Sequence, residues 1–190
     1  MFLMPSGKIV TVFDDRSLAI VYGTFLEDAL ERSLRSSFID FEPKKNHSIL
    51  DEMFRDSGAL GSFGAKINLG LMMGLYSGEA WIDLIIIKNI RNSFAHDVEK
   101  ASDFGADKIR ALCNNLKRFE QLLFEAPPKF DVNDPRAALC IFHFFENNYQ
   151  QKLDIPKERY RLAVEVYRSA LARCGDSPDS HAYLHRTPIV

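Results

Sequence analysis

The chain has 190 residues, of which 46% are hydrophobic and 26% are charged, a composition typical of one globular domain and not of a disordered protein. Its formal charge is only -2, so no cationic field of the whole molecule would attract nucleic acid, and any such contact would use a local patch. The three cysteines are widely spaced and no apolar run approaches the roughly 18 residues of a membrane span, so we expect a soluble cytoplasmic protein without disulfides.

A long amphipathic helix is the strongest local prediction. From residue 16 to about residue 38, apolar side chains recur every four positions, as the buried face of a helix requires. Asp14 and Asp15 precede this run and are typical helix N-caps. Gly23 interrupts the run at a cost of about 1 kcal/mol relative to alanine, which is tolerable if another helix crosses closely there. Residues 9–12 are expected to form a short strand or an irregular lead-in.

Shorter elements follow in the middle of the chain. The sequence predicts a connection over residues 41–47 and helices over 48–56, 65–76, 79–96 and 106–125. A pair of prolines ends the last of these helices, because proline cannot continue a helix interior.

We interpret the C-terminal third as an addition to this domain. Helix-start signals precede helices expected over residues 136–152 and 157–173, although alternating apolar residues in the second also suit a strand. The division that we expect is a helical domain over residues 1–128, a helical extension over 129–175 and a flexible tail over 176–190.

The most apolar stretch lies in the middle of the sequence. The run from Leu84 to Ile87 suits a buried strand or a buried helix, since periodicity alone does not separate the two. The apolar pattern continues through Ile90 and Phe94, and neighbouring segments offer no partner strands, so length decides for a helix. Apolar positions on every side predict a central helix covered by others. The expected fold class is therefore all-α, a multi-helix bundle around a buried central helix.

Three polar side chains close this central helix. Asn92 and His96 are one helical turn apart, and Arg91 can reach the same spot if the helix ends there. An arginine that stabilises phosphate oxygens and a histidine that exchanges protons near neutral pH are what a metal-independent ribonuclease requires. The alternative is an interhelical clamp, in which Arg91 pairs with Glu27 or Asp28 on the first helix. In the clamp, His96 would bond a backbone carbonyl, whereas catalysis needs both Arg91 and His96 open to a cleft.

A glycine-rich segment also permits two interpretations. Gly58, Gly61 and Gly64 precede Lys66, so their N–H groups could face an anion at a helix N-terminus. The GK[ST] ending of a P-loop is missing, however, and we favour a packing turn.

Other charged and histidine residues carry less information. Arg110, Lys117 and Arg118 form only a modest basic stripe, which we interpret as a solvated face. The remaining histidines form no persuasive metal site, since His181 and His185 fall in the expected tail. We expect no metal and no cofactor.

Three stretches together resemble the mannitol operon repressor family: DDRSLAIVYGTFLEDALERSLR, GALGSFGAKINLGLMMGL and IKNIRNSFAHD. The resemblance covers about Asp14 to Glu125, and GxLGSFxAKI is its most specific part. It implies an all-helical domain that regulates genes for sugar-alcohol uptake. No helix-turn-helix with a basic recognition helix stands out, so regulation through a protein partner is as plausible as operator binding. A homodimer is expected in either case.

The segment RNSFAH also resembles the Arg-polar-(x)n-His motif of HEPN domains, which are helical modules of toxin ribonucleases and of inactive scaffolds. That resemblance implies Arg91, Asn92 and His96 as active residues, composite across a dimer. The function expected first is thus a repressor-like regulator, with a metal-independent ribonuclease of the HEPN type, or an inactive scaffold related to it, as the alternative. A small-molecule sensor with an internal pocket is a third hypothesis.

Overall fold

The computed structural model describes residues 2–3, 9–10, 14–38, 43–97, 101, 103–120 and 153–174. The helices of this part of the chain include α1 (Asp15–Ser37), α2 (Pro43–Phe54), α3 (Phe63–Met72), α4 (Gly78–His96), α5 (Asp107–Asn114) and α9 (Pro156–Cys174). The strands among the described residues are two residues long, β1 (Phe2–Leu3) and β2 (Ile9–Val10), and they pair antiparallel. The predicted all-α bundle is therefore confirmed.

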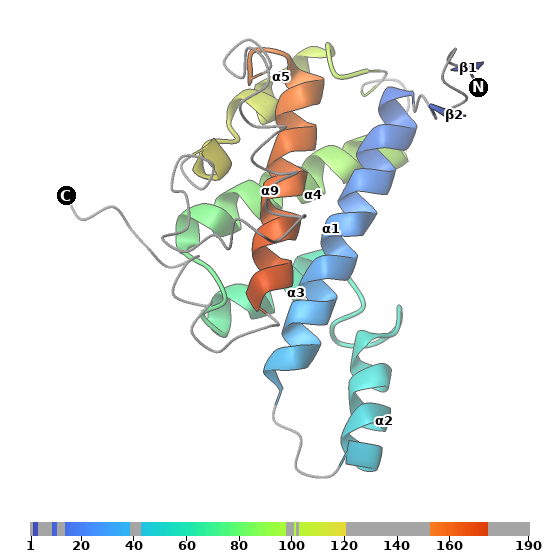
Figure 1. Cartoon of the computed structure of the whole chain (residues 1–190), viewed down its shortest axis with the longest axis vertical. Coiled ribbons are helices and arrows are strands. Elements are labelled where there is room, and N and C mark those ends of the chain that lie inside the picture. The colour runs from blue at the N-terminus through green and yellow to red at the C-terminus, as the bar shows by residue number, and fades with distance from the viewer. Residues whose placement is uncertain are drawn as a thin grey trace, which may run out of the picture.

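Helices α1 and α9 lie side by side and run in the same direction (Figure 1). Three contacts in the same order along both helices fix this parallel register. Lys157 forms an ion pair of 2.7 Å with Asp15, the hydroxyl of Tyr160 donates to the carbonyl of Ala19, and Arg168 stacks on Phe25. Helix α9 thus shares one buried cluster with α1 and α4.

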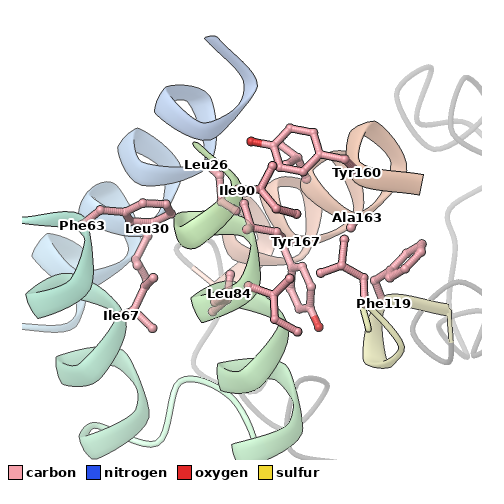
Figure 2. Packing of buried hydrophobic residues seen from close by; sticks show 14 of the residues in the cluster. Leu26, Leu30, Phe63, Ile67, Leu84, Ile90, Phe119, Tyr160, Ala163 and Tyr167 are labelled. Atoms are coloured by element: carbon pink, nitrogen blue, oxygen red, sulfur yellow. The ribbon is translucent and has the colours of Figure 1, made fainter. Parts of the chain in front are cut away.

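Helix α4 crosses behind this pair and packs on α1, α3 and α5 (Figure 1). Its apolar face is fully enclosed, with Leu84, Ile87, Ile90 and Phe94 at 0% exposure. In Figure 2, Leu84 and Ile90 lie between the leucines of α1 and the tyrosines of α9. The prediction of a central helix in place of a strand is confirmed. Its cover is incomplete, however, because Ile82 is 51% exposed.

Several helix boundaries differ from those that the sequence predicts. Helix α2 begins at Pro43 within the expected connection, because proline suits the first turn of a helix, where its missing N–H is not needed. Helix α3 ends at Met72 and not near residue 76, because Gly74 adopts a positive φ of 71° and turns the chain. The strand alternative for residues 157–173 is wrong, since α9 occupies that stretch.

The helix predicted over residues 106–125 is interrupted. Helix α5 ends at Asn114, and a new helical turn begins at Arg118. Arg159 of α9 holds the interruption in place, because its guanidinium donates to the carbonyl oxygen of Leu116 and forms an ion pair with Glu120. The same guanidinium donates to the carbonyl of Leu153 over 3.3 Å. The helix expected over residues 136–152 and the tail over 176–190 lie outside the described residues.

The crossing of α1 and α4 requires a glycine. A Cβ at Gly23 would lie 2.6 Å from Cγ and 3.0 Å from Cβ of Arg91, and 3.3 Å from the hydroxyl of Tyr160. Rotation about χ1 of Arg91 would move its Cγ but not its Cβ, so the 3.0 Å approach would remain and the contacts of the guanidinium would be lost. The close crossing expected at Gly23 is therefore confirmed.

We expect Gly23→Ala to lower the free energy of unfolding by about 1–2 kcal/mol, because overpacking costs about 1–3 kcal/mol and the gain in helix propensity returns only part of that. Gly64→Ala is the matched control. A Cβ there would meet only Cδ and Nζ of Lys88, at 3.7 and 3.8 Å, which is ordinary contact, so stability should stay unchanged or rise by up to about 1 kcal/mol. Urea denaturation followed by circular dichroism measures both, and equal effects would contradict the close crossing.

Candidate functional site

The polar end of α4 brings Arg91, Asn92 and His96 to the last two turns of the helix. His96 is the final helical residue, and the N–H of Asp97 donates to the carbonyl of Ser93 to close the helix. His96 is exposed, whereas Arg91 and Asn92 are half-buried. The guanidinium of Arg91 donates to the Oδ1 atom of Asn92 over 3.2 Å, so these two polar groups hold each other.

Arg91 also faces a carboxylate of α1. Its Nη2 lies 3.6 Å from Oε2 of Glu27, and the side chain of Glu27 is only 14% exposed. Asp28 is exposed and Glu27 is the acid that the structure brings to Arg91. A second contact fixes the same end of α4, since Arg16 donates to the carbonyl of Ala95 over 3.2 Å. Arginine–acid pairing between α1 and α4 is the geometry that the clamp hypothesis expects.

The pair Arg91–Glu27 is one end of a longer chain of alternating charges. Its central member is Lys66 of α3, which is 5% exposed and whose Nζ lies 3.0 Å from Glu27 and 2.8 Å from Glu31. Helices α1, α2, α3 and α4 all contribute to this chain, which we call the ion-pair chain. Its members in order are Arg91, Glu27, Lys66, Glu31, Arg35 and Asp51.

The ion-pair chain keeps its buried groups charged. Burial on its own disfavours the charged form of Lys66, but the hydrogen bonds with Glu31 and Glu27 outweigh burial and raise the pKa of Lys66. For Glu31, burial works toward a higher pKa, and the hydrogen bonds from Lys66 and Arg35 reverse this and lower the pKa. Three cations and three anions alternate, so the ion-pair chain is electrically neutral.

The glycine segment packs as a turn between α2 and α3. A Cβ at Gly58 would lie 2.3 Å from two carbonyl oxygens of α2, and a Cβ at Gly61 would lie 2.4 Å from the carbonyl oxygens of Arg55 and Asp56, which follow α2. The N–H of Gly58 donates to the carbonyl of Arg55, and the N–H of Gly61 donates to the carbonyl of Gly58. These N–H groups are therefore occupied by the chain itself. Gly64 meets no close atom, and the N-cap of α3 is Ser62.

The structure also shows a buried acid that sequence reasoning missed. Asp83 of α4 is 2% exposed and accepts hydrogen bonds from the N–H of Lys117 and of Phe119 and from the hydroxyl of Tyr167. Burial raises the pKa of Asp83, against the opposing effect of these hydrogen bonds. Asp83 is distant in the sequence but thus caps the helical turn that begins at Arg118. The sequence signal that could have identified Asp83 was a single acidic residue within an apolar run.

The basic stripe expected on the helix predicted over residues 106–125 is not a uniformly solvated face. Arg110 and Lys117 are exposed, but Arg118 is 3% exposed and its Nε lies 3.7 Å from Oε2 of Glu79 on α4. The interpretation of Arg118 as a solvated residue is wrong, because Asp83 draws the segment that carries it against α4.

Comparison of the chain with protein-family models, with curated proteins and with solved structures gives no match. Among the described residues, no group of three or more His, Cys, Asp and Glu side chains is placed to hold a metal ion. No helix in the same part of the chain is long and apolar enough to cross a membrane. The site is therefore defined by its own geometry, which is a neutral ion-pair chain that ends at Arg91, on the same helix as the exposed His96.

Lys66→Met should lower the free energy of unfolding by about 3 kcal/mol, because it leaves Glu27 and Glu31 facing each other without the cation between them. Arg55→Met is the matched control. It breaks an ion pair with Glu52 whose side chains are 60% and 70% exposed, and should change stability by no more than about 0.5 kcal/mol. Thermal and urea unfolding measure both variants. A decrease in unfolding free energy of less than about 1 kcal/mol for Lys66→Met would contradict a structural role of the ion-pair chain.

The lowered pKa of Glu31 makes part of the stability depend on pH. Because the folded protein binds this proton less readily than the unfolded chain, the stabilisation is complete above the ordinary pKa of 4.5 and is lost as the pH falls through the lowered value. The difference in unfolding free energy between the wild type and Glu31→Gln should therefore be constant from about pH 6 to 8 and shrink below pH 4.5. Urea titrations across this range test it, and a difference that grows on acidification would contradict the assignment.

Proposed function

We propose that the chain is a helical regulatory domain of the mannitol operon repressor type, which acts in the cytoplasm by binding a protein and not by chemistry. The partner is a second copy of the chain or a different regulator, and the output is control of genes for sugar-alcohol uptake. The observation that carries the proposal is the position of Arg91 between Asn92 and the carboxylate of Glu27.

A carboxylate beside Arg91 opposes phosphate binding. An RNA phosphate that approached this guanidinium would meet Glu27, a like charge 3.6 Å from Nη2, in a partly buried setting where charges are weakly screened. Glu27 is in turn held by Lys66, so it does not swing away without leaving a buried cation behind. Arg91 is thus a positioning residue between α1 and α4, as a scaffold requires.

The charge pattern supports a protein partner over direct operator binding. The ion-pair chain is neutral, and the whole molecule carries a formal charge of -2, so attraction to the phosphate backbone gains little from either. The turn of Gly58 and Gly61 shapes the connection of α2 to α3. It lies within GxLGSFxAKI, the most specific part of the resemblance to mannitol operon repressors. Regulation through contacts between proteins needs no cationic surface.

A metal-independent ribonuclease is the second candidate. One observation favours it: His96 is exposed and follows Asn92 by one helical turn, so an imidazole is open to solvent beside a polar pair. In that case Arg91 would stabilise phosphate charge and His96 would exchange the proton.

One experiment separates the two functions. Purified protein is incubated with structured and single-stranded RNAs in EDTA, and binding to DNA and RNA is measured in parallel by fluorescence anisotropy. We expect no cleavage and no binding tighter than the weak non-specific level of about 10⁻⁴–10⁻⁶ M at physiological salt. RNA cleavage that His96→Ala abolishes, while the folded helical signal stays intact, would overturn the regulatory proposal in favour of the enzyme.

A further inference from the structure

Helix α2 is attached to the rest of the molecule by few contacts. The extensive contacts between helices join α1, α3, α4, α5 and α9, and α2 takes part in none of them. In Figure 1, α2 lies beside the end of α1 and away from α5. Of the α2 side chains that the structure describes, Phe54 alone is buried, whereas Leu50 and Met53 are half-buried. A helix with so little buried apolar surface belongs to the least stable part of a fold.

Two side chains at the end of α1 contact α2. The guanidinium of Arg35 lies 4.5 Å from the ring centroid of Phe54, and its Nη1 atom lies 2.9 Å from Oδ1 of Asp51. Phe38 meets the ring of Phe54 edge-on, with 6.4 Å between the ring centroids. Asp51 and Phe54 are three positions apart and so share one face of α2. An acid and an aromatic ring on α2 therefore face a cation and an aromatic ring at the end of α1.

The cation of this contact is oriented by groups outside α2. Oε1 of Glu31 accepts from Nε of Arg35 over 2.9 Å, and Lys66 of α3 in turn binds Glu31. Without Asp51, the ion-pair chain would keep three cations and two anions, a net charge of +1. The ring of Phe38 would also lose the ring that packs on it. Such a site attracts a carboxylate and an aromatic ring, which are the groups that α2 supplies.

We propose that α2 is an autoinhibitory arm, which occupies a recognition site made by Arg35 and Phe38 until a partner helix displaces it. The partner helix carries an acidic residue three positions before an aromatic residue, as Asp51 and Phe54 do on α2. Few contacts are lost on release, and the carboxylate of Asp51 is 73% exposed, so its ion pair adds little to them. The inference rests on the proposed function, because it names the chemistry of the protein that the regulator binds.

A peptide of residues 43–56, PKKNHSILDEMFRD, tests the site when it is labelled with fluorescein and titrated with the full chain in fluorescence anisotropy. The wild type should bind it weakly, because its own tethered α2 competes at an effective concentration on the order of millimolar. Phe54→Ala in the full chain should bind the native peptide at least about tenfold more tightly, since the resident arm then competes poorly. Circular dichroism shows that this variant keeps its helical signal.

Variants of the peptide test which groups the site recognises. Phe54→Ala in the peptide should weaken binding to the Phe54→Ala chain at least about tenfold, because the ring that Arg35 and Phe38 contact is then missing. Asp51→Asn in the peptide should weaken binding about two- to fivefold, as expected for an exposed ion pair. Glu52→Gln is the matched control, since Glu52 is 70% exposed and pairs with Arg55, and this peptide should bind like the native one.

The outcomes separate the arm from the regulatory function. Equal affinity of the wild type and the Phe54→Ala chain for the native peptide, or no binding to the variant up to about 500 µM, overturns the arm. An Asp51→Asn peptide that binds no more weakly than the Glu52→Gln peptide overturns the role of the acid. None of these measurements involves RNA or DNA, so a failed arm leaves the regulatory function standing. RNA cleavage would overturn that function and leave the arm untouched.

Discussion

Helices α1 and α4 approach each other closely because Gly23 has no side chain at their crossing, and this approach decides what Arg91 does. The aliphatic part of Arg91 fills the space above Gly23, and its guanidinium then reaches Glu27 one turn further along α1. From Glu27 the ion-pair chain continues through Lys66 to α3 and on to α2. A missing Cβ at one position therefore fixes the direction of a charged network across four helices.

The C-terminal side of the core depends on a different kind of contact. Asp83 reaches from the middle of α4 to cap a helical turn at Arg118, and it also accepts the hydroxyl of Tyr167 on α9. Burial of this carboxylate without these donors would be strongly unfavourable. We therefore expect α4, the turn at Arg118 and α9 to fold together. Polar contacts thus specify how α4 meets the surrounding segments, through ion pairs on the side of α1 and through one acid on the side of the Arg118 turn and α9.

The sequence predicts those parts of the fold that depend on local patterns. Helices α1, α4 and α9 carry long apolar periodicities, and their existence follows from the residues themselves. The break near residue 115 was not predictable, because the group that caps the next turn is Asp83, more than thirty positions earlier. At the site, pairing of Arg91 with Glu27 follows from their places on two adjacent helices. The partnership of Lys66 with Glu31 does not, since it depends on the register between α1 and α3.

The contacts of Arg159 bring residues 116, 120 and 153 to one place on the folded core. Its guanidinium donates to the carbonyl oxygens of Leu116 and Leu153 and pairs with Glu120. One side chain of α9 therefore carries the bonds that hold residue 153 and the segment after α5 together, so loss of its guanidinium would release both stretches at once.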